Sequence, residues 1–89
     1  MRIEILRNGA VENVRELPDD DFELSVGRDV ASDIVLDSRD VSRRHAKLMR
    51  MGGVLMVADV GSSGGTWYDG GRLESPAVLS AGETVKMGS

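Results

Sequence analysis

Turn signals recur every few residues along this chain, and they constrain its fold more than any other feature. The strongest is Asn8-Gly9, because a type I′ turn needs positive φ at both central residues. The other signals lie at Pro18-Asp19-Asp20, Gly52-Gly53, residues 61–65, Asp69-Gly70-Gly71, Ser75-Pro76 and Ala81-Gly82. No stretch keeps the apolar spacing of a helix for ten residues without a glycine. The pattern therefore predicts short strands joined by turns.

The segments between these turns have the character of strands. Apolar and polar residues alternate over 2–5 and 22–26, which is the period of a strand with one buried face. Neighbours in a strand face opposite ways, so one of Trp67 and Tyr68 should be in the core and the other exposed. The expected strands are residues 2–6, 12–17, 22–26, 34–36, 46–51, 55–59, 66–68 and 84–87. Strands at this spacing predict an all-β fold, a two-sheet antiparallel β-sandwich.

Length and residue types exclude several classes of protein. A sequence of 89 residues forms one domain, here residues 1–89, with no linker or repeat. The absence of cysteine excludes a disulfide framework and thiolate metal sites, and a single histidine argues against catalytic zinc, so no metal or cofactor is expected. No apolar run approaches a membrane span and no signal peptide opens the sequence, which favours a cytoplasmic protein without a membrane partner.

Charge is unevenly distributed along the sequence. The net charge of −4 argues against nucleic acid or an anionic membrane as the partner. Residues 1–23 carry a net charge of −4, whereas residues 39–50 hold five basic residues against Asp40 alone, a net charge of +4. Charge alone leaves two interpretations of this basic segment open, a solvated loop or a binding segment.

Three loop segments carry residue types that bind an oxyanion. They are residues 25–28, which end in Arg28, residues 40–45, which include Ser42, and the glycine-rich residues 59–66. Loops at one end of a sandwich cluster together, so these groups could converge. An arginine presents a planar fork to two phosphate oxygens, a hydroxyl donates another bond, and glycine lets backbone N–H groups come close. The three segments predict a phosphate site.

Together the segments resemble the forkhead-associated (FHA) domain. Its motifs match, in order and spacing, Gly27-Arg28, Ser42-Arg43-Arg44-His45 and Gly64-Gly65-Thr66. Residues 32–36, 59–63 and 79–85 are also similar to the family's pattern, so the resemblance spans nearly the whole sequence. It implies a sandwich of the FHA/SMAD type with binding loops at one apex. The implied function is recognition of phosphothreonine in a partner protein, in bacterial Ser/Thr kinase signalling and without catalysis.

The resemblance also implies a role for individual residues. Arg28 would bind the phosphate, and Ser42 would donate its hydroxyl and its backbone N–H. Arg43 would add a contact to the phosphate or to the peptide backbone. Ser63 would line the cleft for the phosphothreonine methyl group. Asp40 would read the peptide residues that follow the phosphoresidue and favour a basic or small one there.

Gly64 departs from the family pattern, which has asparagine at this position. That asparagine usually bonds the peptide backbone on both sides of the phosphoresidue. The loss of two hydrogen bonds, each worth roughly 0.5–1.5 kcal/mol, implies at least about tenfold weaker binding. The departure keeps an alternative open, a phosphate-independent interaction or oligomerisation module on the same fold.

The remaining motif residues are expected to shape the loops. In the family, the histidine at His45 bonds across loops, and Gly27, Gly65 and Thr66 are likewise taken as structural. Ser42, His45 and Asp59 include the residue types of a hydrolytic triad, but Ser42 does not stand in the Gly-x-Ser-x-Gly context of a nucleophile elbow, and the sequence has no Gly-Lys-Thr/Ser of a P-loop. No enzymatic activity is expected.

The C-terminal end of the sequence differs from the family pattern. The pattern has one more strand after residue 88, beside the N-terminal strand, so the protein is expected to be truncated or cut from a longer one. The N-terminal strand would then have an open edge, which favours a dimer through that edge.

Overall fold

The fold is built entirely of short strands. The computed structural model describes residues 1–88, and within that range it contains ten strands and no helix, so none that could span a membrane. The strands are β1 (Arg2–Arg7), β2 (Ala10–Glu16), β3 (Phe22–Gly27), β4 (Ile34–Val35), β5 (Ala46–Met51), β6 (Val54–Asp59), β7 (Thr66–Tyr68), β8 (Gly71–Arg72), β9 (Ala77–Leu79) and β10 (Val85–Met87).

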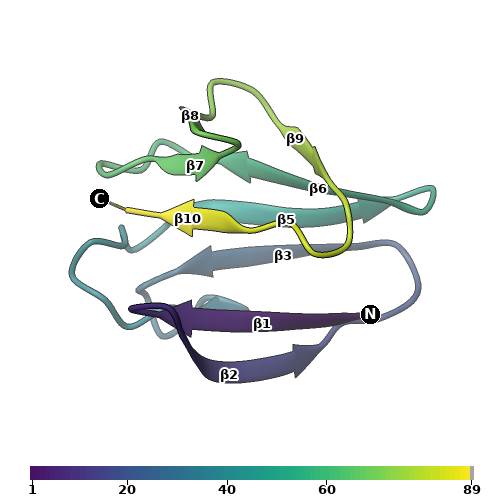
Figure 1. The fold of residues 1–89 in the computed structure, drawn as a ribbon, viewed down its shortest axis with the longest axis horizontal. Coiled ribbons are helices and arrows are strands. Elements are labelled where there is room, and N and C mark those ends of the chain that lie inside the picture. Colours follow the sequence, from purple (N-terminus) through teal and green to yellow (C-terminus); the bar gives the residue numbers. More distant parts are fainter. Residues whose placement is uncertain (89) are drawn as a thin grey trace.

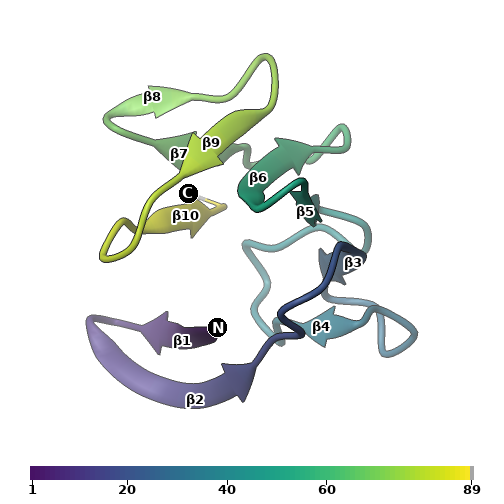
Figure 2. The ribbon, with the colours of Figure 1, turned by 90° about the vertical axis from the view of Figure 1, so that its right-hand side faces the viewer.

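The strands form two facing layers. One layer is a five-stranded sheet in the order β4-β3-β5-β6-β9. The other contains the three-stranded sheet β10-β7-β8 and the hairpin β1-β2, which lie on the same side of the five-stranded sheet (Figures 1 and 2). The predicted sandwich is thus confirmed, and the pairs are antiparallel with one exception. Strands β3 and β4 run parallel, and β4 pairs with the last two residues of β3, Val26 with Ile34 and Gly27 with Val35.

Three hairpins have the two-residue turns that their glycines predict, and in the one between β7 and β8 Asp69 and Gly70 have φ of 51° and 80°. Asn8 and Gly9, between β1 and β2, both have positive φ, at 52° and 79°. Gly52 and Gly53, between β5 and β6, have φ of 58° and 81°. Positive φ at both central residues is the type I′ geometry, whose twist matches that of the flanking strands.

The core lies between the layers and consists of small and medium aliphatic side chains. Alternation along β3 and β5 puts every second residue into it, as the register Leu24↔Leu48 and Val26↔Ala46 shows. Its buried members are Leu17, Val26, Ile34, Ala46, Leu48 and Val57.

The structure corrects three expectations about the strands. Strands β8 and β9 were not expected, and both are short and lie at sheet edges. Trp67 and Tyr68 do not divide between core and solvent, because both are half-buried. Trp67 leans over the preceding loop, where its Nε1 donates to the Gly64 carbonyl at 2.9 Å, and Tyr68 extends its hydroxyl to Glu83.

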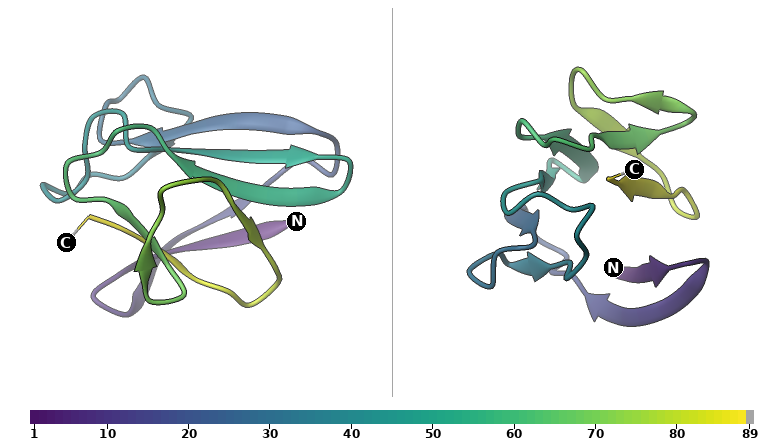
Figure 3. Two further views of the ribbon diagram at one scale, coloured as in Figure 1. Left: turned by 90° about the horizontal axis from the view of Figure 1, so that it is seen from above. Right: turned by 90° about the vertical axis from the view of Figure 1, so that its left-hand side faces the viewer.

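The three loops of interest lie at one end of the sandwich. The first loop follows β3, the second precedes β5 and the third follows β6. All three gather at the end where β10 also finishes (Figures 1 and 3). The Gly52-Gly53 turn lies at the opposite end (Figure 1). We call the first end the apex.

Candidate phosphate-binding site

The first loop packs closely against the second and is hydrogen-bonded to it. A Cβ atom at Gly27 would lie 2.0 Å from the carbonyl oxygen of Arg43, so only glycine allows the two backbones to cross here. The next two amides donate across the crossing, from Arg28 to the Ser42 carbonyl at 3.0 Å and from Asp29 to the Arg43 carbonyl at 3.2 Å. Arg28 is therefore fixed directly beside the segment that contains Ser42.

The Arg28 side chain is oriented by the same segment. Its Nε donates to the carbonyl of buried Val41 at 3.0 Å, which leaves the two Nη groups for a ligand. Within residues 1–88, no carboxylate lies at ion-pair distance from this guanidinium. The residue is exposed, so its charge is available to an anion.

Ser42 joins the second loop to the third. Its Oγ accepts the backbone N–H of Ser63 at 3.0 Å. A hydroxyl that accepts one bond still has its own hydrogen to donate. The backbone N–H of Ser42, in contrast, already donates to Nδ1 of His45 at 3.0 Å. The N–H of Ser42 is thus engaged within its own loop, and the hydroxyl is the donor that Ser42 retains.

His45 connects the second and third loops from below. It is fully buried, and its Nε2 lies 2.8 Å from the Gly65 carbonyl. Because a carbonyl only accepts, Nε2 carries the hydrogen, while Nδ1 accepts from Ser42. Both ring nitrogens are thus engaged with backbone groups. Neither can take a proton from a serine hydroxyl or pair with Asp59, so this histidine cannot serve in a triad.

Asp59 organises the third loop, a role that the motif comparison did not assign to it. Its Oδ2 accepts the backbone N–H groups of Gly61 and Ser62 at 2.9 and 3.0 Å. Its Oδ1 accepts the hydroxyls of Ser62 and of Thr66, the latter at 2.7 Å. Burial raises the pKa of Asp59, but the hydrogen bonds from Ser62 and Thr66 outweigh it and lower the pKa to about 2. The Asp-x-Gly-Ser sequence, typical of an Asx turn, is the signal that could have found it.

The C-terminal end of β10 completes the apex. Gly65, at φ +85°, offers its carbonyl both to His45 and to the backbone N–H of Gly88, the latter at 2.9 Å. Asp40 packs against Gly88, where a Cβ atom would lie 2.4 Å from the Asp40 carbonyl oxygen. Asp40 and Arg43 are both exposed on the second loop. Thr66, in contrast, is fully buried.

Arg72 supports the third loop from the side and was also missed. Its Nη2 donates to the carbonyls of Ser62 and Ser63 at 3.1 and 3.4 Å. Its guanidinium lies against Gly65, where a Cβ atom would be 2.7 Å from Nε. Arg72 lies in none of the three motif segments, and only the pairing of β7 with β8 brings it to this loop.

The structure therefore brings Arg28, Ser42 and Ser63 together through direct contacts between loops. Gly64 lies between Ser63 and Gly65 and is half-buried. No group of three metal-ligating side chains occurs in the described part of the protein. A guanidinium and a hydroxyl on a rigid apex, beside a glycine-rich loop, can hold a tetrahedral anion.

Comparisons with known proteins agree with this geometry. The FHA domain family matches residues 24–88. The glycogen accumulation regulator GarA of Mycolicibacterium smegmatis is 47% identical over 64 residues, which are 72% of this chain and 40% of that protein. The chain thus spans less than half the length of this relative.

Solved structures share the fold over most of the sequence. The FHA domain of CT664 from Chlamydia trachomatis has a TM-score of 0.82 at 29% identity and covers 98% of this chain and 86% of that one. The N-terminal FHA domain of Rad53p from S. cerevisiae, in complex with a phosphothreonine peptide, has a TM-score of 0.74 at 26% identity and covers 85% and 73%. On the family match, the shared fold and the three converging loops, this chain belongs to the FHA domain family.

Proposed function

We propose that this FHA domain binds phosphothreonine in a partner protein, within a cytoplasmic Ser/Thr kinase pathway of a bacterium. One observation carries the proposal: Arg28 is bonded to the backbone of the loop that presents Ser42, so both donors belong to one rigid unit. The Rad53p domain, which shares the fold, is in complex with a phosphothreonine peptide in its solved structure.

The chemistry of the two donors suits a phosphate. A phosphothreonine carries roughly −1.5 to −2 charges at pH 7 and three acceptor oxygens. The Arg28 Nη groups offer a fork to two of these oxygens, and the Ser42 hydroxyl offers a third donor. Hydrogen bonds to charged groups contribute about 1.5–3 kcal/mol each, so these two residues supply most of the affinity.

The residues around the phosphate would contact the peptide. Arg43 extends the cationic surface toward the phosphate or the peptide backbone. Ser63, whose N–H is bonded to Ser42, would line the cleft for the threonine methyl group. Asp40 would favour a basic or small residue after the phosphoresidue. Gly64 provides no side-chain amide, so we expect modest affinity.

The test is a calorimetric titration with matched peptides. A phosphothreonine peptide should bind, and the same peptide with unmodified threonine should not. Arg28→Ala should lower affinity at least about a hundredfold, because both Nη contacts to a charged group are lost. Arg2→Ala, which removes an equal charge from the exposed strand β1, serves as the control and should retain binding.

A second candidate function rests on Gly64. Without the asparagine of the family, this domain could hold a partner independently of phosphate. Equal affinity for the phosphorylated and unmodified peptides, unaffected by Arg28→Ala, would favour this candidate over the first.

We also propose that the open strand edges support a dimer. Within residues 1–88, β1 pairs only with β2 and β10 only with β7, so each has one unpaired edge. Unpaired N–H and C=O groups at such an edge can pair with a second molecule. Sedimentation over a range of concentrations tests this, and a strictly monomeric species at the highest concentration would contradict it.

A further inference from the structure

On the outer face of the three-stranded sheet, a row of three side chains places an aromatic ring between two cations. Lys86 of β10 pairs with Trp67 of β7, and Trp67 pairs with Arg72 of β8. Thr66 points into the core, so Trp67 points outward, and its cross-strand partners share that face. We call these three residues the Trp67 row.

The Trp67 row is continuous with the phosphate-binding loops. Trp67 Nε1 donates to the Gly64 carbonyl at 2.9 Å, and Arg72 Nη2 donates to the Ser62 carbonyl at 3.1 Å. Gly88, two residues after Lys86, donates its N–H to Gly65. All three strands of the row therefore meet the third loop, at the position where the family asparagine is missing.

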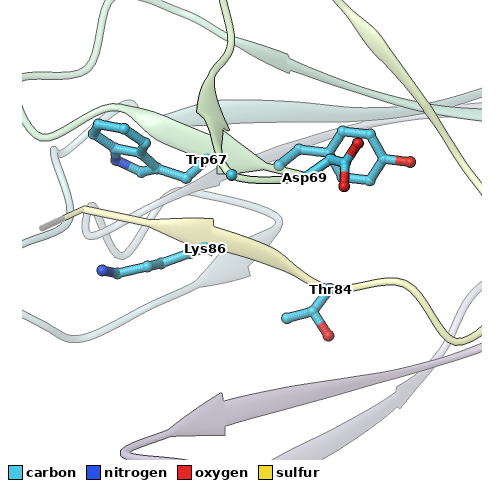
Figure 4. A pocket seen from close by; sticks show the side chains of 6 residues that line it. Trp67, Asp69, Thr84 and Lys86 are labelled. Carbon is cyan, nitrogen blue, oxygen red and sulfur yellow. The ribbon is translucent and has the colours of Figure 1, made fainter.

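Beside the row lies an open hollow. It has a volume of about 340 Å³ and is lined by Trp67, Tyr68, Asp69, Gly70, Thr84 and Lys86. In Figure 4, the Trp67 and Lys86 side chains extend together toward the end of β10, whereas Asp69 lies on the other side of the hollow. The apex end of the hollow is thus cationic and aromatic, and its acidic group is at the far end.

The two cationic side chains of the Trp67 row are available to pair with an anion. Lys86 is exposed, and no carboxylate lies at ion-pair distance from it within residues 1–88. Arg72 likewise has no carboxylate at ion-pair distance in the described residues, and its hydrogen-bond partners are neutral carbonyls. Two such cations beside an indole face form a surface that complements a carboxylate on an aliphatic stem.

We propose that the Trp67 row is a subsite for an acidic side chain of the bound phosphopeptide, one that flanks the phosphothreonine. This inference rests on the proposed function. The stem of a glutamate would lie on Trp67 while its carboxylate pairs with Lys86. The contact anchors the peptide beside Gly64, where the backbone grip of an asparagine is absent.

The test is a glutamate scan of the peptide. A phosphothreonine peptide with alanine at the flanking positions is compared with peptides that place one glutamate, or one lysine, at each flanking position in turn. At the position that reaches the row, glutamate should tighten binding about two- to fivefold, the effect of an exposed ion pair. Lys86→Ala should bring the ratio between the two peptides to about one, and Lys86→Glu should transfer the preference to lysine. Arg2→Ala should leave the ratio as in the unmodified protein.

Failure of the function and failure of the subsite give different results. If no phosphorylated peptide binds more tightly than its unmodified form, the phosphothreonine function is wrong. If phosphorylated peptides bind but glutamate gives no gain at any flanking position, the subsite is wrong. A gain that persists in Lys86→Ala, or an equal loss for the alanine and glutamate peptides in that variant, would also overturn the subsite.

Discussion

The apex has two halves that are built differently. In the phosphate half, Arg28 and Ser42 are each held by hydrogen bonds from a neighbouring loop, and Gly27 lets those loops cross. In the peptide half, Gly64 contributes only backbone, and Asp40 is an exposed side chain on the second loop. The proposed phosphate donors are preorganised, whereas the groups that would hold the peptide are few.

The difference teaches how this domain divides its binding free energy. A preorganised pair of donors, one of them charged, contributes strongly because little entropy is lost when it meets its ligand. A peptide half without the asparagine side chain contributes little to the binding free energy, so nearby surfaces must select the partner. We therefore expect changes in the phosphate half to be severe and changes in the peptide half to be mild or even favourable.

The largest expected effect is that of Gly27→Ala. The new Cβ would lie 2.0 Å from a backbone oxygen, so the first and second loops must separate. We expect a loss of about 3 kcal/mol in the free energy of unfolding, as for other overpacked sites, together with loss of phosphopeptide binding. Gly71→Ala is the control, because its Cβ would lie at an ordinary 3.9 Å from the Tyr68 carbonyl oxygen. Denaturant unfolding measures both, and equal stability of the two variants would contradict the crossing.

His45 offers a similar test from beneath the apex. His45→Ala removes the bond to Ser42 within the second loop and the bond to Gly65 of the third loop, and it leaves a buried cavity, with an expected cost of about 2–3 kcal/mol in unfolding free energy. His45→Phe refills the volume without the bonds. If the bonds matter for function, both variants should lose phosphopeptide affinity in a titration. Full affinity in His45→Phe would show that the ring only fills space.

Asp59 predicts a specific response to acid. Its pKa is about 2 in the folded protein against an ordinary 3.8, so the unfolded state binds the proton more readily. The stabilisation is complete above about pH 4 and is lost as pH falls toward 2, with a size of about 2 kcal/mol. Asp59→Asn should remove this part of the pH dependence, whereas Asp20→Asn should retain it. Unfolding curves between pH 2 and 7 measure the effect, and identical profiles for Asp59→Asn and the unmodified protein would refute it.

The smallest expected effect is a gain. Gly64→Asn restores the amide of the family motif, and two hydrogen bonds to the peptide backbone should raise affinity about tenfold. The titration used for the unmodified protein measures it. An unchanged or lower affinity would mean that the peptide half is occupied by another arrangement, and would remove the contrast between the two halves.

Much of the fold could be predicted because turn chemistry and alternation are local. The expected strands at 46–51 and 66–68 coincide with β5 and β7. β8 and β9 were not predicted in this way, because Gly71 of β8 belongs to a turn signal and the three residues of β9 are all apolar and show no alternation. The parallel pairing of β4 with β3 depends on the path of a loop, which alternation does not encode.

Residues of the candidate site could be predicted only where they belong to a family motif. Arg28, Ser42 and His45 stand in spaced motifs, and in the structure each of them is hydrogen-bonded to a neighbouring loop. The hydrogen bond from the Ser42 N–H to His45 could not be predicted from the sequence, because it requires the His45 ring to turn back beneath its own loop. The contact of Arg72 with the third loop likewise follows from strand pairing and from no local pattern.

The most direct test of the apex as a phosphate site is to map backbone amide shifts by NMR during titration with a phosphothreonine peptide. We expect the largest shifts at residues 28, 42–43 and 63–64, and small shifts at the Gly52-Gly53 turn at the opposite end. Arg28→Ala should abolish the shifts at the apex. Largest shifts at the Gly52-Gly53 end, or apex shifts of equal size with the unphosphorylated peptide, would contradict a phosphate site at the apex.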